Sequence, residues 1–105
     1  MLIYIDIDDT ICRLAKPMRY ESAFPIPEAI KKVNHLYDKG HTIVMWTARG
    51  TKTGIDHRDL TLYQLNSWGL KFHELKMGKP AYDIFIDDKN INSVDWLNEK
   101  DSDNW

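Results

Sequence analysis

The sequence has little cysteine and little net charge. Cys12 is the single cysteine among 105 residues, so no disulfide can form within the chain. Proteins without disulfides are typical of a reducing compartment, and we therefore expect a cytoplasmic location. The formal net charge is only −2 at pH 7. Neither a nucleic acid nor a membrane is an expected partner, because the chain has no basic surface or polybasic run to attract one.

Long hydrophobic runs are also missing. The first apolar stretch, Met1–Ile5, meets the charged Asp6 at once, and it is too short for a signal peptide or a membrane span. No repeat or low-complexity segment is found, and 43% hydrophobic with 29% charged residues is ordinary for a globular protein. We expect one domain over residues 1–98, followed by a polar, frayed tail at 99–105.

The apolar pattern predicts strands alternating with helices. Strands are predicted at Leu2–Ile7, Thr42–Trp46 and Asp83–Ile86, with a weaker one at His73–Met77. Helices are predicted at Pro27–Lys39, about Asp56–Trp68 and about Asn90–Asn98, the second with an apolar line of Leu62, Leu65 and Trp68. The strand runs do not alternate polar with apolar residues, which favours parallel strands covered on both faces. This order predicts an α/β, Rossmann-like parallel sheet with helices on both faces.

One long connection interrupts this pattern. The segment from Asp9 to Ile26 contains no clear element, and loops of that length are usually functional in a compact domain. A small flap over a site and a mobile surface loop are both open interpretations of it.

Acidic residues gather where two predicted strands end. Asp6, Asp8 and Asp9 close the first strand, and Asp87 and Asp88 close the last. The carboxyl ends of parallel strands meet at one edge of a sheet, where such folds bind ligands. Carboxylates placed together repel unless a cation neutralises them, and oxygen ligands favour a hard ion such as Mg²⁺. The alternative is that these aspartates only cap turns and helices.

Two further residues are expected at the same edge. Thr47 follows the second strand, and its hydroxyl and N–H can hold a phosphoryl oxygen. Lys79 precedes the strand Asp83–Ile86 and can bring positive charge to the same oxygens. With the acids, they supply a nucleophile, a metal site and donors, which is the set that phosphoryl transfer requires.

These residues resemble a known family. The ordered motifs are Asp6-Ile-Asp8-Asp9-Thr10, then Thr47, then Lys79, then Asp87-Asp88, and they are similar to the four motifs of the haloacid dehalogenase-like hydrolase superfamily. Trp46-Thr47-Ala48-Arg49 and Gly78-Lys79-Pro80-Ala81-Tyr82-Asp83-Ile84-Phe85-Ile86-Asp87-Asp88 resemble more narrowly its small capsule-biosynthesis-type phosphatases. One departure is Asp9, which stands where glycine is common.

The resemblance implies a fold and a role for each residue. It implies about four strands in the order 3-2-1-4 and no cap domain. Asp6 would attack phosphorus, and Asp8 would give and take the proton. Mg²⁺ would be held by Asp6, the carbonyl of Asp8, and Asp87, while Asp88 would orient water or Lys79. The catalytic residues would thus be Asp6, Asp8, Thr47 and Lys79, and the substrate would be bound by Thr47, Ala48, Arg49 and Lys79.

Several functions remain open at this stage. The resemblance implies a phosphatase that acts on a phosphorylated small molecule, a sugar phosphate of surface-polysaccharide or nucleotide-sugar supply, with a nucleotide or other phosphomonoester as the alternative. From another class come a phospho-accepting receiver domain and an inactive metal-binding relative. The receiver fits less well, because its phosphorylated aspartate ends a middle strand rather than the first. A site without a cap could also be covered by a second subunit, so a homo-oligomer is a further expectation.

Overall fold

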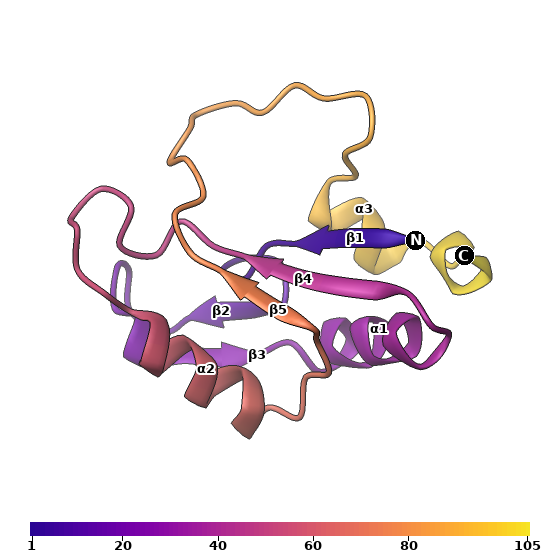
Figure 1. Ribbon diagram of the computed structural model, residues 1–105, viewed down its shortest axis with the longest axis horizontal. Coiled ribbons are helices and arrows are strands. Elements are labelled where there is room, and N and C mark those ends of the chain that lie inside the picture. The colour runs from indigo at the N-terminus through magenta and orange to yellow at the C-terminus, as the bar shows by residue number, and fades with distance from the viewer.

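The protein is an α/β domain built on a short parallel sheet. The computed structural model describes residues 1–105, except for the side chains of Asp101 and Asp103. Its elements are β1 (Leu2–Ile5), β2 (Cys12–Leu14), η1 (Tyr20–Ser22), β3 (Ala23–Pro25), α1 (Pro27–Asp38), β4 (Thr42–Trp46), α2 (Arg58–Ser67), β5 (Glu74–Lys76), α3 (Ser93–Asn98) and η2 (Asp101–Asn104). Strands β1, β4 and β5 form a three-stranded parallel sheet in the order β1-β4-β5 (Figure 1). The described residues contain no inserted cap domain.

The register of the sheet aligns the carboxyl ends of its strands. Leu2 pairs with Thr42 and Ile5 with Met45, so the residues that follow β1 and β4 emerge at the same edge. The central strand β4 buries three successive side chains, at positions 43–45, as expected for a strand covered on both faces. Strand β1 alternates instead, with Leu2 and Tyr4 exposed, because it lies at the edge of the sheet.

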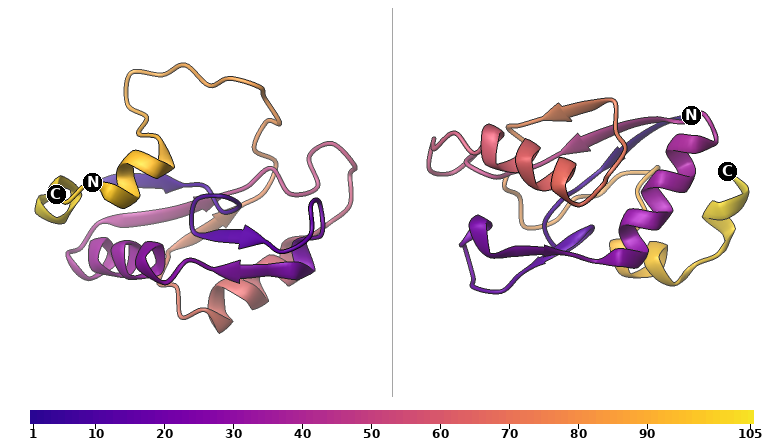
Figure 2. Two further views of the ribbon diagram at one scale, coloured as in Figure 1. Left: turned by 180° about the vertical axis from the view of Figure 1, so that it is seen from behind. Right: turned by 90° about the horizontal axis from the view of Figure 1, so that it is seen from below.

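Helices α1 and α2 lie on the same side of the sheet (Figures 1 and 2). Helix α1 begins with Pro27 and buries Ala29, Ile30, Val33 and Leu36, which recur at helical spacing. The connections β1-α1-β4 and β4-α2-β5 wind in the same direction. Since crossovers between parallel strands are right-handed, both helices must cover one face. Helices on both faces were expected, but a crossover helix on the second face requires a further parallel strand on the other side of β1.

That fourth strand is not formed. Residues 83–86, expected to be a strand, lie in an irregular loop between β5 and α3 that arches away from the sheet (Figure 1). Ile84 and Ile86 are 78% and 92% exposed. The sheet order is therefore β1-β4-β5, and the expected four-strand order is not confirmed. This segment cannot form a strand without a partner, since the backbone hydrogen bonds of a strand are made with a neighbouring strand rather than within the strand itself.

Helix α2 buries polar residues in addition to its predicted apolar line. The expected apolar line is confirmed, since Leu65 is in the core and Leu62 and Trp68 pack against it, but the polar residues Thr61 and Gln64 are buried as well. The reason is a buried arginine, Arg49, whose guanidinium takes Thr61 and Gln64 as hydrogen-bond acceptors. Buried charge requires such partners, so the helix turns a polar stripe inward.

The long connection after β1 is an ordered flap. Strands β2 and β3 pair antiparallel in a small two-stranded sheet, and η1 lies between them in sequence. Ile11 and Cys12 of this segment are fully buried, so its base belongs to the core. Cys12 is therefore a packing residue, and burial raises the pKa of its thiol to about 12.

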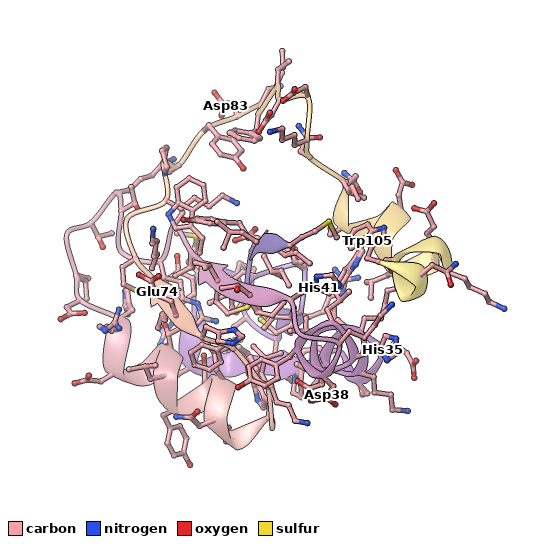
Figure 3. The ribbon with its side chains drawn as sticks, turned by 45° about the vertical axis from the view of Figure 1, so that its right-hand side comes forward. His35, Asp38, His41, Glu74, Asp83 and Trp105 are labelled. Atoms are coloured by element: carbon pink, nitrogen blue, oxygen red, sulfur yellow. The ribbon has the colours of Figure 1, made fainter. Side chains whose placement is uncertain are left out.

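The C-terminal segment is attached rather than frayed. Lys32 of α1 donates from its Nζ to the carbonyl of Glu99 at 2.6 Å. Ser102 is buried, and Trp105 packs against the core. Figure 3 shows Trp105 on the same side of the domain as His35 and His41. The prediction of a frayed tail was wrong, because the large indole of Trp105 finds apolar surface to cover. In the part of the chain that is described, no helix has the length and apolar character needed to cross a bilayer.

Candidate active site

Asp6 and Lys79 form an ion pair at the carboxyl edge of the sheet. Asp6 follows β1 directly, and its Oδ1 lies 3.6 Å from Nζ of Lys79. Burial raises the pKa of the Asp6 carboxyl above its ordinary value, Lys79 opposes this rise, and the nearby Asp8 adds to it. The pair therefore brings together the two residues expected to be the nucleophile and the cation of the site.

The backbone of Lys79 is fixed by two threonines. Its N–H donates to the carbonyl of Thr47 at 3.0 Å, and its carbonyl accepts from Oγ1 of Thr51 at 2.8 Å. The ammonium lies 5.7 Å from the ring centre of Trp46 and 5.4 Å from that of Tyr82. Contacts of this kind stabilise a cation over an aromatic face. Lys79 is thus a restrained, mostly buried lysine (its side chain is 14% exposed), not a solvated surface charge.

Thr47 is buried at the end of β4. Its N–H donates to the carbonyl of Lys76, which extends the pairing of β4 and β5 by one bond. Its Oγ1 accepts from the N–H of Arg49 at 3.1 Å. The backbone after β4 therefore turns sharply at Thr47, next to the end of β1 where Asp6 lies.

Asp8 and Arg49 form a bidentate salt bridge. Nε of Arg49 donates to Oδ2 of Asp8 at 2.9 Å, and Nη2 donates to Oδ1 at 2.8 Å. The guanidinium is fully buried, whereas the Asp8 side chain is 23% exposed. The sequence predicted that Arg49, next to Ala48, binds substrate. In the structure its guanidinium is instead paired within the protein.

Asp9 lies in the tight turn that follows this pair. Its φ is 63°, in the left-handed region, and its N–H donates to the carbonyl of Cys12. Glycine adopts this conformation most freely, but aspartate is among the residues that tolerate it best. This accounts for an aspartate where the resembling family commonly has glycine.

The later acidic pair does not reach this edge. Asp87 and Asp88 lie on the exposed segment 80–92, and a hydrogen bond with the Asp88 side chain lowers the pKa of Asp87. Figure 3 shows Asp83 on the outer arch of the same loop. Among the side chains that the structure describes, no three His, Cys, Asp or Glu residues come close enough to hold a metal ion. The expected ligand set of Asp6, Asp8 and Asp87 is therefore incomplete, because the strand that should carry Asp87 to β1 is not paired.

A small cavity adjoins the site. Its volume is about 130 Å³, and it is lined by residues 49–51 and 55–57 together with Met77 and Gly78. Gly50 closes this loop tightly, since its φ is 83° and an added Cβ would come 2.1 Å from the carbonyl oxygen of Ile55. The cavity is large enough for a few non-hydrogen atoms of a ligand.

Sequence reasoning missed several residues around the site. Trp46 and Tyr82 flank Lys79. Tyr20, Thr61 and Gln64 surround Arg49. Thr61 and Gln64 carried a usable signal: two polar residues three apart share one helix face, next to Leu65. The aromatic residues carried none, because nothing local distinguishes a ring beside a lysine from a ring in the core.

Comparisons with known proteins establish the fold only. No protein-family model matches the chain. No curated protein matches it at the level required. The chain is similar to the crystal structure of an MCSG target from Vibrio cholerae, with a TM-score of 0.84, 21% identity, and coverage of 94% of this chain and 89% of that one. The fold and site thus define a small α/β domain with an Asp–Lys pair at the carboxyl edge of its sheet.

Proposed function

We propose that this protein is a Mg²⁺-dependent phosphomonoester hydrolase of the haloacid dehalogenase-like superfamily, with Asp6 as its nucleophile. The observation that carries the proposal is the ion pair of Asp6 and Lys79, held beside Thr47 at one edge of the sheet. A carboxylate next to a restrained cation and a buried threonine suits attack on a phosphoryl group.

The reaction would run in two steps. In the first, an Asp6 oxygen bonds to phosphorus, the bond to the leaving oxygen breaks, and Asp8 gives that oxygen a proton. In the second, Asp8 takes a proton from water, the water oxygen bonds to phosphorus, and the bond to Asp6 breaks, which releases phosphate. Lys79 and Thr47 would stabilise the charge on the phosphoryl oxygens during both steps.

The metal site would be completed by the missing strand. We propose that Asp83–Ile86 pairs with the free edge of β1 when Mg²⁺ binds, giving the order 3-2-1-4. Asp6, the carbonyl of Asp8, and Asp87 would then hold the ion, with Asp88 orienting water or Lys79. When bound, Mg²⁺ would supply positive charge to the phosphoryl oxygens. Two observations support this docking: the exposure of Ile84 and Ile86, and the exposed Leu2 and Tyr4 on β1.

The substrate class follows from the narrower resemblance. We propose a sugar phosphate of surface-polysaccharide or nucleotide-sugar supply, with other small phosphomonoesters as the alternative. The cavity beside Gly50 and Met77 would take part of the leaving group. A reducing, cytoplasmic setting agrees with the single, buried Cys12. A second copy of the chain could cover the open site.

The test is phosphate release from p-nitrophenyl phosphate and a panel of sugar phosphates, with and without Mg²⁺. We expect Mg²⁺-dependent turnover that Asp6→Asn abolishes. Asp9→Asn is the matched control, because Asp9 is an exposed aspartate of the same cluster whose carboxylate lies 3.6 Å from the exposed Arg13. Equal activity of Asp6→Asn and wild type would mean that Asp6 is not the nucleophile.

The same assay separates the other function classes. A receiver domain would accept phosphate from a small donor such as acetyl phosphate and keep it without turnover. An inactive relative would bind Mg²⁺ and release no phosphate from any compound. Either result would overturn the proposed hydrolase.

A further inference from the structure

Arg49 connects Asp8 to two other parts of the chain. Besides its two bonds to Asp8, the guanidinium donates from Nη1 to Oε1 of Gln64 at 2.6 Å and to Oγ1 of Thr61 at 3.2 Å. Both acceptors are on α2. The guanidinium also stacks near an aromatic ring, since its carbon lies 4.9 Å from the ring centre of Tyr20 in the flap. An arginine restrained in this way has one orientation.

The acceptors are themselves held in place. Gln64 donates from Nε2 to the carbonyl of Tyr20 at 2.7 Å, and Thr61 donates from Oγ1 to the carbonyl of His57 at 2.7 Å. The ring of Tyr20 also meets that of His57 edge to face. The flap, α2 and the turn after β1 are therefore joined through one guanidinium.

We propose that Arg49 is a positioning residue that orients the Asp8 carboxylate for proton transfer and does not bind substrate. This inference rests on the proposed function. A bidentate arginine occupies one lone pair on each carboxylate oxygen. Sγ of Cys12 also donates to Oδ1 of Asp8 at 3.5 Å, which leaves Oδ2 as the oxygen that can exchange a proton. The partly exposed Asp8 can still exchange a proton on its open side, while its rotation is blocked. Since proton transfer requires hydrogen-bond geometry, fixing that rotation favours the reaction.

The test compares two substrates that share a ring and differ in leaving group. Phenyl phosphate needs a proton on its leaving oxygen far more than p-nitrophenyl phosphate does, and kcat/KM reports the transfer to Asp6. We expect Arg49→Gln to lower kcat/KM by about 10–100-fold for phenyl phosphate and by clearly less for p-nitrophenyl phosphate. Asp8→Asn should show the same asymmetry, larger in size. Arg49→Lys should lose less kcat/KM than Arg49→Gln, because lysine keeps the positive charge but cannot form the bidentate pair.

Two further measurements separate positioning from other roles. Inhibition by inorganic phosphate should be unchanged in Arg49→Gln, and weaker inhibition would show that Arg49 binds substrate. Arg13→Gln, which removes an exposed arginine from the flap, should match wild type. If Arg49→Gln does not fold, Gln64→Met removes one acceptor of the guanidinium and should give the same asymmetry with a smaller loss.

The failures are distinguishable. Absence of wild-type turnover would overturn the proposed function and this inference together. Wild-type turnover with an equal loss of kcat/KM for both substrates in Arg49→Gln, or in Gln64→Met, would overturn only the inference, because a merely structural role lowers both alike.

Discussion

Docking of the 83–86 segment onto β1 is open to a quantitative test. Ile84 and Ile86 are 78% and 92% exposed in the loop, and burying an isoleucine is worth about 1.5–3 kcal/mol. Docking would therefore gain roughly 2–5 kcal/mol from these two side chains. Fixing the backbone of residues 83–86 costs about 4–8 kcal/mol. The cost exceeds the gain by about 2–3 kcal/mol. Ligation of the proposed Mg²⁺ by Asp6 and Asp87 would therefore decide whether the strand forms.

The perturbation is Ile86→Ala, which removes apolar surface that is buried only in the docked state. We expect a loss of about 2 kcal/mol of docking free energy and hence roughly 30-fold weaker Mg²⁺ binding, measured by calorimetry. Val94→Ala is the control, because Val94 is also exposed but lies on α3. Amide hydrogen exchange of residues 83–86 should slow when Mg²⁺ is added to the wild type. Unchanged exchange, or equal Mg²⁺ affinity in Ile86→Ala, would refute the reasoning.

Three other predictions concern stability and reactivity. Asp6→Asn should raise Tm at neutral pH. Burial raises the pKa of the Asp6 carboxyl, so the folded wild type loses stability as the pH rises through that pKa. The difference in Tm between variant and wild type should shrink toward pH 4, and a lower Tm of Asp6→Asn at pH 7 would contradict this reasoning. Cys12, with a pKa of about 12, should resist Ellman's reagent at pH 8 until the protein unfolds, and fast labelling of the native protein would show an accessible thiolate instead. Because the pKa of the thiol is raised, the stability of the protein should also fall as the pH rises from about 9 toward 12. Gly50→Ala should destabilise the protein by about 2 kcal/mol or more in chemical denaturation, because it adds a clash with Ile55 to the strain of a left-handed φ. Gly54→Ala, which has open space around it, should cost less stability. Equal losses for the two variants would mean that the loop rearranges to accept the added Cβ.

Much of the framework could be predicted from local pattern. Strand β4 was predicted at its observed bounds, and α1 within one residue, since Pro27 begins the helix and its apolar residues recur at helical spacing. The placement of Asp6 and Thr47 at one edge also followed, because parallel strands end together. Lys79 reaches the same edge because it follows β5, whereas it was predicted from its place before residues 83–86, which form no strand.

What the sequence by itself determined is therefore the local structure and the chemistry that follows strand ends. The tertiary structure alone decided the partners: Asp8 and Gln64 for Arg49, the aromatic rings around Lys79, the core contact of Trp105, and the unpaired 83–86 segment. The physical reason is the separation in sequence between the interacting residues. Helix and turn preferences depend on neighbours a few residues away, whereas a buried charge or a strand edge is satisfied by groups distant in the chain, which periodicity does not reveal.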